Sequence, residues 1–456
     1  MYLSGRRPLM TEADVIVAVA TGSGRAAIGV IRLSGPRLSR FMQPLFGREI
    51  APRQAILTDF LDARGRALDQ GIALFFPSPH SYTGEDVLEL QGHGGPAVLQ
   101  LLLRRCLAVG ARLAAPGEFS KRAFLNGKLD LAQAEAVADL IEASSEAAAR
   151  AAMLSLKGEF SHEIQGLVFE LTALRVQIEA CIDFPEEGPD PREERERSQA
   201  LERLQHRLDG IHTRSASGKL LRDGVQVVLI GPPNVGKSSL LNRLAGDDIA
   251  IVTEVPGTTR DTVRSEILVD GMAIHLVDTA GLRETEDPVE QLGIDRARKA
   301  VQGADLVLLV DDVEHGKLDD PDWSLAQIPR TAKRIRVLNK IDLLDRQPDK
   351  RQVCGETQVA VSAKTAAGLA LLHAAILEAT GRSPEGDEGV FLARERHLEA
   401  LARADGHLRD AKNCLTHLEL FAEELRLAQL ALSEITGEFT VDDLLGEIFS
   451  KFCLGK

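Results

Sequence analysis

The spacing of apolar residues changes along the chain, and this change separates an N-terminal part from a helical part. Between about Asp14 and Gly110, apolar residues form short runs of strand length that are separated by turn residues. We predict strands at Val15–Val19, Ile28–Leu33, Ile72–Phe76 and Val87–Leu90, and a helix at Val98–Val109. This mixture predicts a separate N-terminal α/β domain.

After the turn-rich residues 115–118, apolar residues step by three or four, which is the spacing of one helix face. We predict one long helix with the apolar stripe Met153, Leu156, Phe160, Ile164, Leu167, Leu171, Leu174 and Ile178. It spans about seven turns and should end at Asp183, because Phe184 and Pro185 follow. A partner helix up to Leu221 is predicted from the stripe Leu201, Leu204, Leu208 and Ile211.

Helical spacing returns at Phe391 and continues to the C-terminus, so helical segments flank the residues from about Gly224 to Gly381. Each flanking segment would expose an apolar stripe unless the two packed on each other. We therefore expect a discontinuous helical bundle domain that is interrupted by an inserted domain. The expected boundaries are 1–125 for the N-terminal domain, 126–222 and 384–456 for the helical domain, and 223–383 for the inserted domain.

The inserted segment begins with a phosphate-binding loop. Residues 231–238 have the pattern G-x-x-x-x-G-K-S, between an apolar run at Val225–Ile230 and a helix-compatible stretch at Ser239–Leu244. This order of strand, loop and helix is the context in which such a loop binds nucleotide phosphates. Backbone N–H groups cradle the phosphates, Lys237 reaches the terminal phosphates, and the Ser238 hydroxyl is placed to hold Mg²⁺.

Three further motifs follow in the order found in a GTP site, each after an apolar run. In Asp278-Thr279-Ala280-Gly281, the Asp acts on Mg²⁺ through water and the Gly amide senses the γ-phosphate. In Asn339-Lys340-Ile341-Asp342, the last carboxylate can accept the ring N–H and exocyclic amine of guanine, a pairing that adenine cannot offer. Ser362-Ala363-Lys364 would close over the base. The strands expected before these motifs are Ala273–Val277, Ile335–Leu338 and Val359–Val361.

GTP hydrolysis needs a side chain that orients the attacking water, and this sequence has no such side chain directly after the Asp-x-x-Gly motif. Leu282 stands where Ras-like proteins carry the Gln that orients the attacking water. Candidate carboxylates in the following segment are Glu284, Glu286, Asp287 and Glu290, although such charges are ordinarily solvated loop residues. In the first switch, residues 257–261, Thr259 should complete the Mg²⁺ shell when the γ-phosphate is present.

Composition narrows the possible classes of protein. The chain length suggests about three domains, and a net charge of −14 argues against a generally basic surface for nucleic acid. No apolar run approaches the roughly 18 residues of a membrane span. The five scattered cysteines exclude a disulfide framework and a thiolate zinc site by their spacing. We expect a cytoplasmic protein whose translation starts at Met1 or, in a more natural context, at Met10.

Several motifs outside the nucleotide loops resemble the MnmE (TrmE) family of tRNA-modifying GTPases. They are IRLSG at 31–35, TGEDVLELQGHGG at 83–95, PGEF at 116–119, FLNGKLDLAQAEA at 124–136 and FCLGK at 452–456. Within the nucleotide segment, Asn234 in the phosphate loop and GTTRD at 257–261 resemble the family as well. The resemblance covers essentially the whole chain from Asp14. It implies a multidomain α+β and α/β fold: an N-terminal α/β tetrahydrofolate-binding domain that forms a homodimer, a discontinuous helical bundle, and an inserted Ras-like P-loop GTPase domain.

The resemblance also implies GTP hydrolysis that is activated by potassium-dependent dimerisation of the GTPase domains. Asn234 would bind K⁺ together with Thr253, Val255 and Thr258, and the cation would stabilise developing charge as an arginine finger does. Glu290 would orient the hydrolytic water through a second water, so Glu290, Lys237 and Thr259 are the expected catalytic residues. The residues expected to contact GTP are Asn234, Val235, Gly236, Lys237, Ser238, Ser239, Thr253, Glu254, Val255, Pro256, Gly257, Thr258, Thr259, Asp278, Thr279, Ala280, Gly281, Asn339, Lys340, Asp342, Ser362, Ala363 and Lys364.

By the same resemblance, Arg32, Glu89 and Lys128 are expected folate contacts, with Lys456 reaching the pocket from the C-terminus. The cations suit the glutamyl carboxylates of 5-formyl- or 5,10-methylene-tetrahydrofolate, while Glu89 can accept from the pterin amine and ring N–H. Two interpretations of Cys453 stay open. A thiolate of low pKa near two lysines would be a catalytic nucleophile, whereas a buried thiol would only pack the terminal helix.

Members of this family work with the FAD-binding partner MnmG, in a heterotetramer, on the wobble uridine of certain tRNAs. They install an aminomethyl or carboxymethylaminomethyl group at C5, and folate supplies the one-carbon unit. This sequence has no G-x-G-x-x-G fingerprint, so the flavin would belong to the partner. The alternative is a ribosome-assembly GTPase resembling Era or Der, but neither a KH pattern nor a second phosphate loop is found. A dynamin-like membrane GTPase would need an amphipathic or basic membrane-facing segment, and the acidic sequence shows no obvious one.

Overall fold

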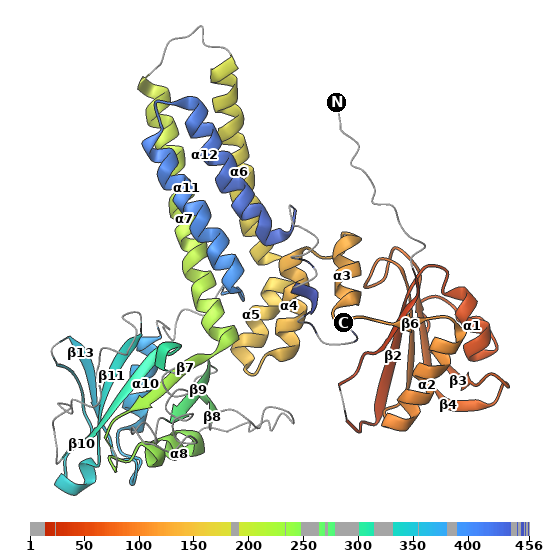
Figure 1. Cartoon of the computed structure of the whole chain (residues 1–456), viewed down its shortest axis with the longest axis horizontal. Helices are drawn as coiled ribbons and strands as arrows, with labels where there is room; N and C mark the ends of the chain where they lie inside the picture. The colour runs from red at the N-terminus through yellow and green to blue at the C-terminus, as the bar shows by residue number, and fades with distance from the viewer. Residues whose placement is uncertain are drawn as a thin grey trace, which may run out of the picture. The chain divides into compact units, whose positions relative to one another are not determined.

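The computed structural model describes residues 14–22, 24–183, 191–232, 234–247, 264–269, 272–278, 301–313, 332–353, 355–380, 390–438, 445, 448–450, 452 and 455. Its mixed α and β elements are shown in Figure 1. They divide into two compact units, which are described separately. The first is drawn from Met1–Ala138, Ile164–Val168 and Gln429–Lys456, and the second from Asp139–Glu163 and Phe169–Ala428. No described helix is both long enough and apolar enough to cross a membrane.

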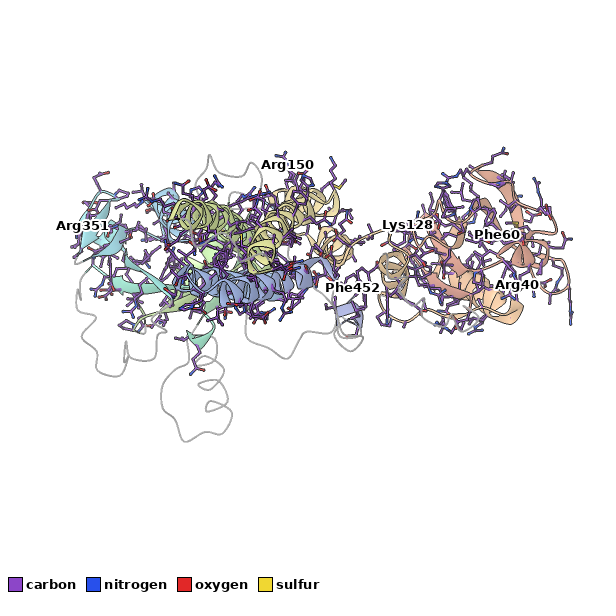
Figure 2. All side chains as sticks on the ribbon, turned by 90° about the horizontal axis from the view of Figure 1, so that it is seen from above. Arg40, Phe60, Lys128, Arg150, Arg351 and Phe452 are labelled. Carbon is purple, nitrogen blue, oxygen red and sulfur yellow. The ribbon has the colours of Figure 1, made fainter. Side chains whose placement is uncertain are left out.

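A single sheet organises the described N-terminal residues of the first unit, with its six strands in the order β3-β4-β5-β2-β1-β6. The strands are β1 Ile16–Val19, β2 Ile28–Gly35, β3 Ile56–Leu61, β4 Ala67–Phe76, β5 Asp86–His93 and β6 Arg112–Leu113. Helices α1 Ser39–Phe46 and α2 Pro96–Val109 bury their apolar faces in one core with the sheet. Phe60 of β3, which is labelled in Figure 2, lies in this core. Residues that alternate with the core positions point to the other face of the sheet.

The four strands and the helix predicted for this part are confirmed; β1 is one residue shorter than predicted, and the other four elements are longer. The apolar pattern misses three elements for identifiable reasons. Strand β6 has only two residues, and α1 is a short helix that contains Pro44. Strand β3 turns Thr58, a polar residue, inward beside Phe60, which weakens the alternation that predicts a strand.

Long helices make up much of the remaining described chain: α4 Leu131–Glu142, α5 Glu146–Leu156, α6 Glu159–Asp183, α7 Pro191–Asp223, α11 Glu395–Asn413 and α12 Leu418–Thr436. Helices α7 and α11 pack along each other, although the nucleotide segment lies between them in sequence (Figure 1). An ion pair of 2.5 Å joins Arg207 of α7 to Glu170 of α6. His407 of α11 lies 2.7 Å from Glu424 of α12.

The prediction of one helix from Met153 to Ile178 is wrong at its start. The chain breaks between α5 and α6, where Gly158 has a φ of +89°, a conformation that favours glycine. Met153 is 41% exposed, whereas the predicted stripe from Phe160 to Ile178 is buried. The break keeps a four-residue step from Leu156 to Phe160, so apolar spacing alone does not reveal it. The predicted end at Asp183 is confirmed.

The nucleotide segment forms a second sheet, whose seven described strands have the order β12-β13-β11-β10-β7-β9-β8. They are β7 Val225–Ile230, β8 Arg264–Val269, β9 Met272–Asp278, β10 Leu306–Asp312, β11 Lys333–Asn339, β12 Lys350–Val353 and β13 Glu356–Ala360. The five inner strands are parallel, and β8 and β12 are antiparallel edges. Helices α8 Lys237–Asp247 and α10 Leu369–Ala379 contribute to the core on one face. The strands predicted around the nucleotide motifs are confirmed, except that Val361 lies just beyond β13.

Candidate functional site

The nucleotide motifs lie at the edge of the sheet where a ligand is expected from topology. Chain order reverses beside β7, because β9 is on one side of it and β10 is on the other. In open parallel sheets, ligands bind outside the carboxyl ends of the strands at such a reversal. The phosphate loop follows β7, Asp278 ends β9, and Asn339 ends β11. The fold thus gathers motifs that are up to about a hundred residues apart.

The phosphate loop has a backbone that only particular residues accept. Asn234 and Gly236 have φ values of +65° and +92°, in the left-handed region. A Cβ at Gly236 would also lie 2.5 Å from Nδ2 of Asn339, so a side chain is excluded there by space as well. The buried Lys237 begins α8, and its ammonium donates to the carbonyl oxygens of Gly231 and Pro232, each at 2.8 Å. This geometry holds a positive charge over the loop, beside the amides of a helix N-terminus.

Asn339 ties the phosphate loop to the base-side loop. Its Nδ2 donates to the Val235 carbonyl oxygen at 2.9 Å, and its Oδ1 accepts from the Ala363 amide at 3.0 Å. The side chain is buried, so each of these bonds is costly to lose. Beside it, the Ser362 hydroxyl donates to Oδ1 of Asp342 at 2.6 Å. The predicted guanine-binding residues are therefore brought together and held by one another.

Asp312 belongs to this cluster and is missed by the sequence analysis. It ends β10, its side chain is 7% exposed, and its Oδ2 lies 3.2 Å from Nζ of Lys340. Lys340 itself has a φ of +64°, so its backbone is strained for a residue with a side chain. The available signal was an acidic pair, Asp311 and Asp312, at the end of an otherwise apolar strand. Asp312 fixes the ammonium of Lys340 at the entrance to the base-side loops.

Several predicted site residues lie outside the described residues and stay predictions. They are Glu290, Cys453, Lys456, Thr253, Glu254, Val255, Pro256, Gly257, Thr258, Thr259, Thr279, Ala280 and Gly281. Asp278 is described as the last residue of β9. Ser238 and Ser239 in the first turn of α8 are exposed, as is Asn234 in the loop.

A second cluster of polar residues lies on the outer face of the N-terminal sheet. Arg32 on β2 and Glu89 on β5 are direct neighbours in the strand register, and Nε of Arg32 donates to Oε1 of Glu89 at 2.9 Å. The guanidinium carbon lies 5.6 Å from the ring centre of Tyr82 and 6.0 Å from that of Phe119. Gln91 donates to the other oxygen of Glu89 at 3.2 Å. These two predicted folate residues therefore lie together and satisfy each other's charge.

Lys128 follows α3 Glu118–Leu125 and is exposed (Figure 2). Its side chain passes close to Gly84, where an added Cβ would lie 3.3 Å from Cε of the lysine. Gly84 has a φ of +78°, so this position favours glycine for its backbone as well. The adjacent Tyr82 hydroxyl is 2.8 Å from Oγ of Ser120, and burial raises the pKa of Tyr82. The loop that carries Tyr82 and Gly84 is thereby attached to α3.

The phosphate loop at the strand reversal and the guanine-side loops define a P-loop GTPase. A family model described as the MnmE helical domain matches residues 131–453, and one described as the GTP-binding protein TrmE N-terminus matches residues 15–128. The tRNA modification GTPase MnmE of Chromobacterium violaceum is 56% identical over 442 residues, 97% of this chain and 98% of that protein. The corresponding protein of Azoarcus sp. is 55% identical, with coverage of 97% and 98%. The chain belongs to the MnmE family, and it is a GTPase that acts in tRNA modification.

Among solved structures, the G domain of the T. maritima FeoB iron transporter is 28% identical, over 34% of this chain and 98% of that chain, with a TM-score of 0.25. Similarity at that score adds no argument about the fold. The assignment rests on the family models and on the full-length relatives.

Proposed function

We propose that this GTPase works with an FAD-binding MnmG partner to install an aminomethyl or carboxymethylaminomethyl group at C5 of the wobble uridine of certain tRNAs. The proposal rests mainly on the match to MnmE relatives over 97% of this chain, which includes the N-terminal sheet as well as the nucleotide segment. A ribosome-assembly role is not retained, because the match extends through domains outside the GTPase. The proposed domains keep the boundaries 1–125, 126–222, 223–383 and 384–456, with the GTPase segment inserted in the helical domain.

In the proposed reaction, the residues of the phosphate loop bind and orient the nucleotide. Lys237 stabilises charge on the terminal phosphates, and Asp342 selects guanine. Ser238 and Thr259 would hold Mg²⁺, which supplies charge neutralisation at the phosphates. Glu290 positions the attacking water, since Leu282 cannot. The position of Ser238 in the first turn of α8, directly after Lys237, supports this assignment.

We further propose that Asn234, Thr253, Val255 and Thr258 hold K⁺ and that hydrolysis is activated when two GTPase domains associate. GTP turnover should then be at least about tenfold faster in K⁺ than in Na⁺, because a lost charge at the transition state costs that much or more. The measurement is steady-state phosphate release in the two salts at equal ionic strength. Asn234→Gly removes the proposed ligand while accepting the φ of +65° at this position, so it should abolish the difference. Equal rates in the two salts for the native chain would contradict the proposal.

The N-terminal cluster is proposed to bind 5-formyl- or 5,10-methylene-tetrahydrofolate through Arg32, Glu89, Lys128 and Lys456. The pairing of Arg32 with Glu89 supports a preformed polar site beside the Tyr82 and Phe119 rings. Cations there would bind the glutamyl carboxylates, and Glu89 would accept from the pterin. In this scheme the folate supplies the one-carbon unit, and the flavin belongs to the partner.

Lys128→Gln should weaken the binding of 5-formyltetrahydrofolate by about tenfold, the loss typical of one charge-assisted hydrogen bond. Because Lys128 is exposed, the melting temperature should not change. Arg40→Gln is the control, since it removes another exposed cation of the same unit. Isothermal titration of the full chain measures both affinities. If Lys128→Gln and Arg40→Gln bound folate equally well, Lys128 would have no role in the pocket.

We also propose a homodimer that joins MnmG in a heterotetramer, acts on tRNA and works in the cytoplasm. The outer face of the N-terminal sheet exposes Ile28, Leu57 and Ile72, and the last two are direct neighbours across β3 and β4. Exposed apolar clusters of this kind mark interaction surfaces, which supports association through this unit. With a net charge of −14, most contact with tRNA is assigned to the partner. For Cys453 both interpretations stay open: a catalytic nucleophile, or a buried thiol that packs the terminal helix.

A further inference from the structure

Asp139 is a buried carboxylate that contacts both connections between the helices and the nucleotide segment. Its side chain is only 4% exposed. One oxygen, Oδ1, accepts from Nε of Arg222 at 2.9 Å and from Nη2 of Arg394 at 2.6 Å. Arg222 lies in the last turn of α7, just before β7, and Arg394 directly precedes α11. A single carboxylate therefore joins the segment that leads into the GTPase sheet to the segment that leads out of it.

Other contacts at this junction, which comprises residues 218–223 and 390–395, hold the same two segments together. Gly218 of α7 is so close to the carbonyl oxygen of Phe391 that any Cβ would overlap with it. Lys219 forms an ion pair with Glu395, and Leu221 shares a small buried cluster with Val390 and Leu392. The junction is therefore packed along its length, and Asp139 contacts it from outside both segments.

The junction continues directly into the strands that carry the nucleotide loops. Nε2 of His275 on β9 donates to the Asp223 carbonyl oxygen, at the end of α7, at 3.1 Å. His275 pairs in register with Gln226 of β7 and lies three residues before Asp278. β7 itself runs into the phosphate loop at Gly231. A displacement of the junction would therefore reach Gly231 through β7 and Asp278 through β9, over only a few residues of regular structure.

Asp139 is the carboxylate that both junction arginines share, and Arg222 also pairs with Asp223 at 2.7 Å. Burial opposes a charge on Arg222, but the field and hydrogen bond of Asp139, together with the fields of Asp223 and Glu142, outweigh it, so the pKa of this guanidinium is raised. Without the carboxylate, two guanidinium groups would face each other with no shared acceptor. A buried ion pair contributes little net stability compared with an apolar replacement, whereas loss of one partner is destabilising because it leaves a buried charge without its counterion; in some proteins such pairs favour one specific arrangement over others. The contacts of this cluster to both connections point to a role in the geometry of the junction.

We propose that Asp139 is a positioning residue that fixes the GTPase sheet on the helices so that GTP hydrolysis is coupled to tRNA modification. The nucleotide loops themselves do not include Asp139, so binding and hydrolysis of GTP need not involve it. Coupling of GTP hydrolysis to tRNA modification does involve Asp139. The junction sets the orientation of the GTPase sheet on the helices, and this orientation determines how a change at Asp278 or Gly231 reaches the helices. Asp139 has this role through Arg222 and Arg394 and does not touch the nucleotide.

Asp139→Asn keeps the size of the side chain but removes its charge, and it tests this role directly. The purified full chain should keep its dissociation constant for GDP and its rate of GTP hydrolysis within about twofold, while wobble uridine modification in cells carrying the variant should fall about fivefold or more. Glu424→Gln is the control, because it also removes one carboxylate charge, and Glu424 pairs with His407 at 2.7 Å between α12 and α11, outside the junction residues. It should leave both activities unchanged.

Arg394 provides a second test with less risk to folding, since Asp139 keeps Arg222 as a partner. Arg394→Gln should lower modification without lowering GTP hydrolysis, and Arg394→Lys should restore it at least in part by keeping the charge. Wild-type levels of modification in both Asp139→Asn and Arg394→Gln would overturn the proposal. The proposal would also be overturned if Asp139→Asn lowered the affinity for GDP as much as it lowered modification, because Asp139 would then only maintain the nucleotide site.

Discussion

Lys237→Ala should lower the rate of GTP hydrolysis by about 100- to 1000-fold, which is the loss expected when one preorganised donor to transition-state charge is removed. The ammonium is buried and held over the phosphate loop by the carbonyl oxygens of Gly231 and Pro232. Alanine cannot replace this charge, and Lys340 of the base-side loop is already paired with Asp312. Single-turnover hydrolysis with excess enzyme measures the effect on the chemical step.

Two comparisons separate a catalytic effect of Lys237 from damage to the fold. Lys350→Ala removes a cation from the edge strand β12 of the same sheet, where Lys350 pairs with Glu378, and should leave hydrolysis unchanged. The melting temperature of Lys237→Ala should fall, since two loop carbonyls lose a donor, but the variant should remain folded at the assay temperature. A single-turnover rate within threefold of the native rate would contradict the assigned role of this lysine.

Asp342→Asn should change the nucleotide preference from guanine to xanthine. The carboxylate is matched to two donors on guanine, the ring N–H and the exocyclic amine, whereas an amide offers one acceptor and one donor. Xanthine presents a ring N–H beside a carbonyl oxygen, which is the complement of that amide. A pocket that leaves a polar group of one base unpaired discriminates against that base by about 10⁴-fold or more. We therefore expect GTP to lose its advantage and XTP to become the better substrate.

The change at Asp342 can be tested against a close neighbour. Asp345→Asn makes the same substitution three residues away, at an exposed position with a φ of +46° that Asn tolerates, and should leave GTP preferred. The Ser362 hydroxyl donates to Oδ1 of Asp342, and an asparagine oxygen can still accept that bond. Competition of GTP and XTP for hydrolysis gives the preference ratio. An unchanged preference for GTP would show that Asp342 does not contact the base.

Local patterns were enough to predict most of the regular elements that position the site. Strands such as β7 and helices such as α7 have apolar spacing that is set by their own sequence, so their positions follow from it. The break at Gly158 does not follow from the apolar spacing, because the apolar residues of α5 and α6 continue the same three- or four-residue steps across it. Elements as short as β6 carry too few residues for any period to be visible.

The candidate site could be predicted as a set of residues but not as an arrangement. Motifs identify Asn339 and Lys237, since phosphate and guanine recognition require those side chains at those spacings. They do not reveal that Asn339 bridges Val235 and Ala363, because this depends on which strand ends are neighbours. Arg32 and Glu89 are 57 residues apart and meet only through strand register.

Asp139 shows the same limit most clearly. Its two arginine partners are 83 and 255 residues away, and nothing in its local sequence distinguishes it from a solvated helical carboxylate. Only the packing of α7 against the segment before α11 makes it a buried contact to both connections. Residues that couple domains are in general defined by tertiary contacts, so they are the least accessible to sequence analysis.

Mass spectrometry of tRNA nucleosides from cells shows whether this GTPase drives the modification of wobble uridine. Cells that lack this chain should lose the C5 modification of wobble uridine, the native chain should restore it, and Lys237→Ala should not. Intact C5 modification in cells that lack the chain, with no second copy of the gene present, would show that this GTPase does not drive the modification.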